Sequence, residues 1–422
     1  MFRNLKLDAT KVYLFIEFAA SALFGMIFVV GSLYEATVAG LTPLQLVLVG
    51  TTLEASAFLF EVPTGVVADA YSRRVSIIIG YMLMGAGFLV YSLFPAFLPI
   101  LLAQVIWGLG YTFTSGATQA WITDEIGEDP ANKLFLRAAQ VGLFASLIGM
   151  GAAVLIGGTN VALPILVGAI GVMLIGVALM VIMPETGFTP TPTEDRNDWQ
   201  HMWHTFNAGV KAVRSHPRLM NIVGVGLFYG LYSEGFDRLW VKHLIDTFTL
   251  PALVGHNQVV FFAALRVVGT LLTIAAVRFV EKRVDTGSPL AIGRAMLIVT
   301  GLISAALIGF AISPLLPLAL GLYLVINVLR NTSSPLQTAW VNQKLDSNVR
   351  ATVHSMFGQV DAIGQVFGGP GVALIARFAS VVAAISTSGL LLTPALFLIG
   401  RANRFSMAEA AEGAEVEAAP AD

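Results

Sequence analysis

The sequence contains no cysteine and few charged residues. The absence of cysteine among its 422 residues excludes disulfide bonds, thiol nucleophiles and thiolate metal sites. Charged residues make up 12% of the chain, whereas a soluble domain has about 25%, and 56% of the residues are hydrophobic. The net charge of −2 gives no general attraction to nucleic acid. A chain so poor in charge is expected to have the lipid bilayer as its solvent.

Motifs for phosphate and metal chemistry are also absent. The sequence has no glycine-rich loop that ends in Gly-Lys-Ser or Gly-Lys-Thr, so ATP is not expected to drive the protein. It has no His-Glu-x-x-His motif, and its six histidines do not form a ligand set. The sequence therefore predicts neither a metal nor another cofactor. Because no clustered nucleophile is present either, it does not predict an enzyme.

Long apolar segments dominate the chain. Twelve of them reach the roughly 20 mostly apolar residues that a membrane-spanning helix needs. They cover residues 11–32, 44–68, 75–94, 97–122, 134–158, 161–183, 218–241, 252–280, 289–311, 314–340, 351–376 and 380–400. Helices are expected, because backbone groups in hydrocarbon must pair within their segment, and barrel strands are shorter and alternate. The predicted fold class is an all-α membrane protein with twelve transmembrane helices.

The longest connection divides these segments into two sets of six. Residues 184–217 open with three prolines and carry several charges, as a linker does. Apolar and aromatic residues recur within it at helical spacing, which predicts a helix in the headgroup region; packing against the bundle is the alternative. Residues 1–183 and 218–404 are then expected to form two pseudo-symmetric six-helix bundles. The Ala- and Glu-rich residues 405–422 are expected to be a disordered acidic tail.

Lysine and arginine gather on one side of the predicted helices. Nineteen of the 24 fall at the N-terminus, in the even-numbered connections or after the last segment. Because basic loops stay in the cytoplasm, this asymmetry predicts that both termini are cytoplasmic. The first segment follows a short basic stretch and is full length, so we expect a membrane helix and not a removable signal. A bacterial-type plasma membrane is the expected location.

A short polar loop separates the second and third segments. It reads Gly65-Val66-Val67-Ala68-Asp69-Ala70-Tyr71-Ser72-Arg73-Arg74. This order is similar to the signature loop of the major facilitator superfamily, Gly-x-x-x-Asp-Arg-x-Gly-Arg-Arg, from which it departs at Ala70 and Ser72. In that family the loop holds the cytoplasmic side closed and releases it on opening. The alternative is a positively charged anchor with no part in gating.

The resemblance implies a gate made by the loop and the end of the fourth segment. The implied gating residues are Gly65, Asp69, Arg73, Arg74 and Asp124. We expect Gly65 to allow a neighbouring helix to approach closely. Arg73 is expected to pair with Asp124 or Glu125. A second motif, Gly-Gly-Pro-Gly at 368–371, resembles the bend of the superfamily's drug:proton exporters and implies an antiporter.

Charged residues inside the segments are the candidates for proton coupling. They are Glu17, Glu54 and Asp361, and each would cost at least about 2.5–3.5 kcal/mol at a helix centre without a partner or a wet cavity. A buried carboxylate can take up and release a proton during each transport cycle. The alternative is a permanent ion pair, for example between Arg266 and Asp361.

The resemblance also implies that the first, fourth, seventh and tenth helices line the transport pathway. The candidates for ion pairing or substrate contact are Arg266, Arg330, Gln104, Tyr111, Tyr232 and Asn331. Aromatic walls with few fixed charges suit apolar or amphipathic solutes, although ordinary packing is the alternative for each residue. The sequence thus predicts a monomeric secondary transporter for proton-coupled multidrug efflux. Uptake or facilitated diffusion of a metabolite is one alternative, and a membrane-embedded non-transport protein of the same fold is another.

Overall fold

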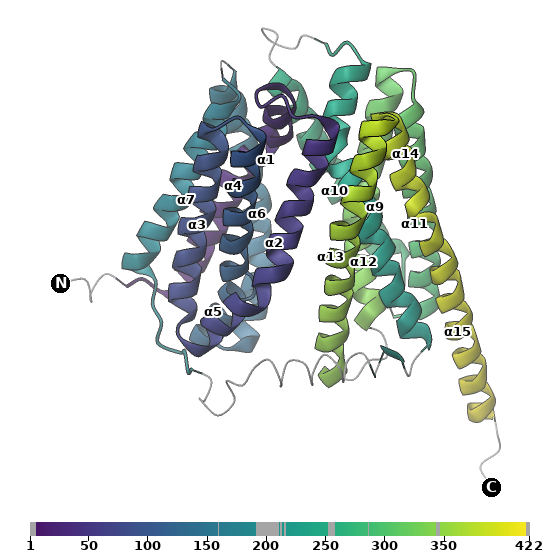
Figure 1. Ribbon diagram of the computed structural model, residues 1–422. Coiled ribbons are helices and arrows are strands. Elements are labelled where there is room, and N and C mark those ends of the chain that lie inside the picture. Colours follow the sequence, from purple (N-terminus) through teal and green to yellow (C-terminus); the bar gives the residue numbers. More distant parts are fainter. Residues whose placement is uncertain are drawn as a thin grey trace. The chain divides into compact units, whose positions relative to one another are not determined.

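The structure is a computed structural model that describes residues 6–158, 160–190, 211, 213–214, 217–251, 258–285, 287–342 and 347–418. All regular elements among these residues are helices (Figure 1). The predicted all-α fold class is therefore confirmed.

Seven helices account for the first six predicted spans. They are α1 (Ala9–Thr37), α2 (Pro43–Ala70), α3 (Arg73–Leu93), α4 (Phe97–Thr114), α5 (Ala117–Ile126), α6 (Glu128–Gly157) and α7 (Ala162–Ile182). Polar caps begin three of them: the Asp8 carboxylate accepts the Lys11 N–H at 3.2 Å, Thr42 forms a reciprocal capping box with Gln45, and the Ser72 hydroxyl accepts the Val75 N–H at 3.0 Å. Gly116 separates α4 from α5, because its φ of 71° lies in the left-handed region that favours glycine.

Seven further helices account for the other six predicted spans. They are α9 (Pro217–Thr247), α10 (Gln258–Arg283), α11 (Pro289–Ile312), α12 (Leu316–Asn342), α13 (Ser347–Phe378), α14 (Val381–Leu391) and α15 (Thr393–Ala418). Helices α14 and α15 together make the twelfth span, with Leu392 between them. The described helices thus include every span that the sequence predicts.

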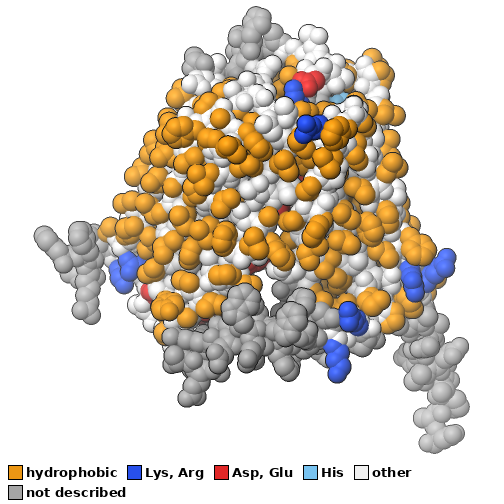
Figure 2. All heavy atoms as spheres, viewed as in Figure 1, with side chains coloured by type: hydrophobic (Ala, Val, Ile, Leu, Met, Phe, Trp, Pro, Cys, Tyr) orange, Lys and Arg blue, Asp and Glu red, His pale blue; other side chains and the backbone are white. Residues whose placement is uncertain are grey.

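Nine of the spans in the described part of the chain are long and apolar enough to cross a membrane. Hydrophobic side chains cover most of the face that Figure 2 shows, as expected for a surface that meets lipid. The three remaining spans, α9, α12 and α13, carry Glu234, Arg330 and Asp361 respectively. Ionisable residues within spans usually face the protein interior or a wet cavity, so these three helices are the first place to look for a functional site.

The chain divides into two compact units. The first comprises residues 1–198 and 249–267, and the second comprises residues 199–248 and 268–422. This division is close to the two predicted bundles, but the first part of α10 groups with the first unit.

Glycines let two pairs of helices cross closely, one pair in each unit. In the first unit α1 packs along α6, where a Cβ atom added at Gly149 would overlap the backbone of Ala22. In the second unit α9 packs along α13, where a Cβ atom added at Gly364 would lie 2.8 Å from the backbone nitrogen of Leu231. Small residues are common at such crossings in membranes, because they let backbones approach.

The end of the chain differs from the sequence prediction. Helix α15 continues to Ala418 and runs past the neighbouring helices α9 and α11 of its unit (Figure 1), where composition predicts a disordered tail from residue 405. Alanine and glutamate are strong helix formers, which gives a physical reason for the continuation. The predicted interfacial helix of the linker lies almost entirely outside the described residues, as do residues 419–422.

Candidate functional site

The polar loop between α2 and α3 holds an ion pair within the first unit. The Arg73 guanidinium lies 2.7 Å from the Asp124 carboxylate on α5 and 3.7 Å from the Asp69 carboxylate. Glu125, the other predicted partner, instead accepts a hydrogen bond from the Gly187 N–H at 2.8 Å. The Arg73 side chain is 19% exposed and that of Asp69 is 61% exposed, so the inner pair with Asp124 is the better shielded. The partner of Arg73 is therefore Asp124, one of the two candidates that the sequence offered.

The same loop is bound to the start of the linker, which the sequence analysis missed. The Glu185 carboxylate accepts hydrogen bonds from the Ser72 hydroxyl at 2.7 Å and from the Arg74 N–H at 2.8 Å. The Trp121 indole N–H on α5 donates to the Pro184 carbonyl at 2.8 Å. The loop, α5 and the first linker residues thus form one polar network at one end of the first unit.

Helix α2 carries the candidates Glu54 and Gly65. Glu54 is partly buried near the crossing with α4, where a Cβ atom added at Gly108 would lie 2.8 Å from Ser56 Cβ and 3.3 Å from the Leu53 carbonyl oxygen. At Gly65 an added Cβ atom would meet no atom of the described residues within 4 Å. The close approach of a neighbouring helix that the sequence predicts at Gly65 is therefore not present within the first unit.

Glu17 lies at the crossing of α1 and α6. A Cβ atom added at Gly142 would lie 2.5 Å from Glu17 Oε1, so the missing side chain at position 142 leaves the space that the carboxylate occupies. The Ser21 hydroxyl donates to the same oxygen at 3.2 Å. Glu17 is partly buried. Its carboxylate accepts one hydrogen bond from a hydroxyl and lies in the narrow space between α1 and α6.

Four aromatic rings meet farther along the same face of α1. Phe24 and Phe28 stack with ring centroids 5.7 Å apart, at helical spacing from Glu17. Phe28 reaches the Trp107 ring of α4 at 5.4 Å, and the Phe88 ring of α3 lies 5.0 Å from Trp107. One face of α1 therefore presents a carboxylate and then an aromatic cluster.

The two candidates on α4 differ in their exposure. Gln104 is 3% exposed, and its side-chain oxygen has no hydrogen-bond partner among the described residues. Tyr111, two turns later on α4, is 50% exposed. Gln104 therefore keeps an acceptor available inside the first unit, whereas Tyr111 presents its ring at the surface of that unit.

The second unit places an ion pair between α9 and α12. Arg330 donates from both terminal nitrogens to the two oxygens of Asp237, with Nη2 and Oδ2 2.7 Å apart. Its guanidinium also lies 5.6 Å from the Tyr232 ring centroid and 5.7 Å from that of Phe236. The Arg330 side chain is 24% exposed and that of Asp237 is 40% exposed, so solvent can reach the pair within this unit.

The sequence analysis missed the charged residues of α9. Glu234 is 3% exposed, and the Arg238 Nε atom lies 3.4 Å from its carboxylate. With Asp237 these residues fall at positions i, i+3 and i+4 of a predicted span, which places them on one helix face. That spacing indicates a charged helix face, and it could have been read from the sequence. The aromatic residues around it drew attention to substrate contact instead.

Asp361 lies at the crossing of α9 and α13. The Gln365 amide donates to its Oδ2 atom at 2.7 Å. A Cβ atom added at Gly230 of α9 would overlap the Asp361 backbone carbonyl and would lie 2.9 Å from the Gln365 nitrogen. Asp361 is partly buried. Each unit therefore has an acidic residue at a glycine-lined crossing: Glu17, whose carboxylate lies against Gly142, and Asp361, whose backbone lies against Gly230.

The remaining candidates are less closely connected. Tyr232 is 2% exposed and lies inside the second unit. The exposed Asn331 makes a local bond, since its amide donates to the Asn327 carbonyl at 2.8 Å. Arg266 lies in the part of α10 that groups with the first unit, whereas Asp361 belongs to the second. A pair between Arg266 and Asp361 therefore stays a prediction.

We expect removal of one partner of the Arg330–Asp237 pair to destabilise the protein. Asp237→Asn and Arg330→Gln should each lower the free energy of unfolding by about 2 kcal/mol, because the charge that remains then loses a bidentate hydrogen bond between two helices. The double variant should lose less than the sum of the two. Thermal unfolding in detergent measures this, with Asp246→Asn as the control. Asp246 pairs with Lys242 at 2.9 Å in an exposed i,i+4 pair, for which about 0.5 kcal/mol or less is expected.

These features define a class of protein: a twelve-span helical membrane protein with ionisable side chains between its helices. The family model of the Major Facilitator Superfamily matches residues 13–369. The chain belongs to the Major Facilitator Superfamily, and is accordingly a membrane transporter.

Two relatives and two solved structures illustrate the similarity. The chain is 25% identical over 359 residues to an uncharacterised MFS-type transporter, YxaM of Bacillus subtilis (strain 168), which covers 84% of this chain and 85% of the relative. It is 28% identical over 91 residues to the uncharacterised MFS-type transporter MJ1317 of Methanocaldococcus jannaschii, which covers 22% of this chain and 21% of the relative.

The solved structures share the fold at low sequence identity. The nucleoside transporter NupG matches with a TM-score of 0.70 and 14% identity, over 95% of this chain and 99% of that one. A bacterial homologue of the human lysosomal transporter Spinster, in an inward-facing and unoccupied conformation, matches with a TM-score of 0.66 and 15% identity, over 94% and 95%.

Proposed function

We propose that the protein is a proton-coupled secondary transporter that exports small apolar or amphipathic molecules. The observation that carries this proposal is the placement of an acidic residue at a glycine-lined helix crossing in each unit: the Glu17 carboxylate lies against Gly142, and Asp361 packs its backbone against Gly230 while its carboxylate accepts from Gln365. Protonation of a carboxylate at such a crossing changes its charge, its hydration and its hydrogen bonds together. Such a group can therefore link proton uptake to a change in helix packing.

The first unit supplies a surface suited to amphipathic substrates. Phe24 and Phe28 lie on the face of α1 that also carries Glu17, and they form one aromatic cluster with Phe88 of α3 and Trp107 of α4. Aromatic rings bind apolar groups and the faces of organic cations, and a carboxylate supplies the opposite charge. This combination favours drug-like amphipathic molecules as substrates.

Uptake or facilitated diffusion of a metabolite is the second candidate. The solved structures with this fold include a nucleoside transporter and a transporter bound to a peptide conjugate, although low identity limits that likeness to the fold. The Arg330–Asp237 pair favours this candidate, because a partly exposed bidentate pair could open to bind a polar zwitterion. Direction and coupling of flux distinguish the two candidates.

Flux through purified protein in sealed liposomes tests the proposal. An amphipathic cationic dye such as ethidium should move against its own gradient only when an opposing pH gradient is imposed. Single cysteines at Tyr71 and Leu315, which are 72% and 61% exposed, report the orientation. We propose that both termini are cytoplasmic, so these two positions should label from opposite sides. The second candidate would be established by two results together: the rate of dye movement does not depend on the pH gradient, and the protein shows saturable flux of a nucleoside or a peptide.

A further inference from the structure

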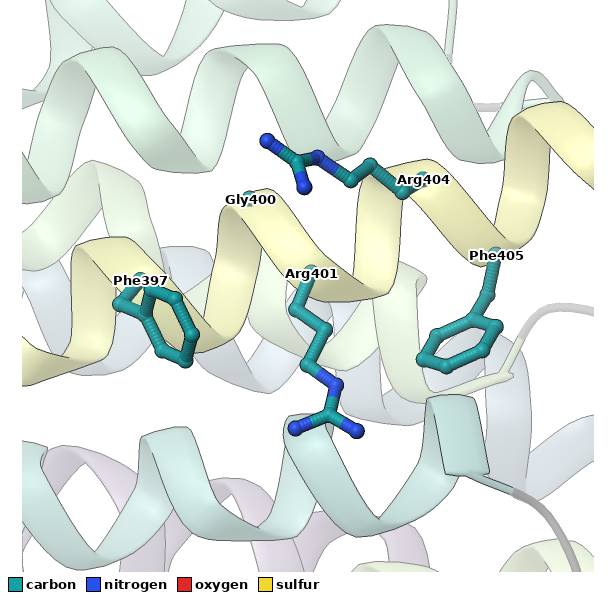
Figure 3. Close-up of a pocket in the computed structure, with 5 residues that line it drawn as sticks. All are labelled: Phe397, Gly400, Arg401, Arg404 and Phe405. Atoms are coloured by element: carbon teal, nitrogen blue, oxygen red, sulfur yellow. The ribbon is translucent and has the colours of Figure 1, made fainter.

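Two arginines and two phenylalanines of α15 surround a hollow on the second unit. The hollow has a volume of about 540 Å³ and is lined by Phe397, Gly400, Arg401, Arg404 and Phe405 (Figure 3). Arg401 extends on the side of the helix that carries the two phenylalanines, and Arg404 extends on the other side (Figure 3). Gly400 has no side chain to fill the hollow, and a Cβ atom added there would meet no atom of the described residues within 4 Å.

The hollow lies where the last span leaves the hydrocarbon. The span begins at Val381, and Arg401 follows it by about 20 residues, which at about 1.5 Å per residue gives about 30 Å, the thickness of the hydrocarbon core. Arg401 and Arg404 therefore lie at the level of the lipid phosphates. Phe397 is one turn closer to the membrane centre and is 70% exposed, so its ring lies at the level of the acyl chains.

The two guanidinium groups are available to a ligand. Both arginines are exposed, and no described carboxylate pairs with either of them. The Arg401 guanidinium lies 6.0 Å from the Phe405 ring centroid, which holds it beside the hollow. On the adjacent helix α11, Gly293 packs directly on Asn403, so the exposed Arg294 adds a third positive charge at the same depth.

We propose that this hollow binds an anionic phospholipid. Its phosphate would lie beside Arg401, on the side of the helix that carries the two phenylalanines, where the guanidinium offers charge-assisted hydrogen bonds and Arg404 adds positive charge from the other side. Its glycerol and first acyl carbons would fill the space beside Gly400 and Phe397. The proposal does not depend on the transported substrate.

Native mass spectrometry of the full chain with phosphatidylglycerol and with phosphatidylcholine tests the proposal. The protein should bind phosphatidylglycerol preferentially, and Arg401→Gln with Arg404→Gln should weaken that binding about thirtyfold, as expected for two basic residues near a membrane surface. Gly400→Leu should weaken it as well, because the side chain fills the hollow and leaves both charges in place.

The matched control is Arg278→Gln with Arg283→Gln on α10. These arginines are also exposed, and the Arg283 guanidinium lies 5.5 Å from the Phe279 ring, so the control removes two charges and an arginine–phenylalanine contact elsewhere in the chain. Lipid binding should survive in the control. An equal loss in the control, unchanged binding after the Arg401 and Arg404 substitutions, or unchanged binding in Gly400→Leu would each overturn the proposed site. Equally tight binding of soluble glycerol 3-phosphate would overturn the assignment to a lipid.

Discussion

Replacement of Asp361 by asparagine is expected to remove most of the flux that a pH gradient drives. Asparagine keeps the shape of the side chain and can still accept the hydrogen bond from Gln365, but it cannot exchange a proton. The free energy that couples two binding sites, here those of the proton and the substrate, is typically about 1–3 kcal/mol. Without that coupling, the acceleration of flux by the pH gradient should fall by about tenfold to a hundredfold. Glu17→Gln should act in the same way at the crossing of α1 and α6. Initial rates of dye flux in liposomes with and without the gradient measure both.

Glu61→Gln is the control for these substitutions. Glu61 is an exposed carboxylate on α2, and we expect its neutralisation to leave gradient-driven flux unchanged. Exchange of substrate without a gradient should persist in Asp361→Asn, because the fold and the aromatic cluster are intact. Full gradient-driven flux in Asp361→Asn, Glu17→Gln and Glu54→Gln alike would refute proton coupling through the predicted carboxylates.

Replacement of Gly149 by alanine is expected to destabilise the first unit strongly. The added Cβ atom would overlap the backbone of Ala22, and backbone cannot rotate away as a flexible side chain can. Helices α1 and α6 would have to separate along their crossing, at a cost of about 3 kcal/mol, which exceeds the roughly 1 kcal/mol that alanine adds to helix propensity. A lower midpoint of thermal unfolding in detergent is the expected result.

Gly151→Ala is the control, two residues away on the same helix. Gly151 is exposed, and an added Cβ atom there would meet no atom of the described part of the chain within 4 Å, so only the gain in helix propensity remains. The two substitutions should therefore shift the unfolding midpoint in opposite directions. Midpoints that rise in both variants would show that α1 and α6 do not depend on a close approach at Gly149.

The spans and the Arg73–Asp124 pair were predictable because both depend on local information. A run of apolar residues marks a helix in lipid wherever its partners lie. Asp124 and Glu125 closely follow the fourth predicted span, on the same side of the membrane as the basic loop. They were therefore the two carboxylates proposed as ion-pair partners of Arg73. Glu185 was overlooked because it follows the sixth span by sequence, more than 100 residues from Ser72, and no local pattern connects them.

Composition and the order of polar and apolar residues determined by themselves that this chain is an all-α membrane protein with twelve spans, and that few charges lie within those spans. The tertiary structure alone decided which charges meet: Asp237 with Arg330, Glu185 with the loop, and Glu17 with the backbone of Gly142. The physical reason is that burial in lipid acts on each segment separately, whereas an ion pair or a glycine crossing depends on the rotation and depth of two helices at once.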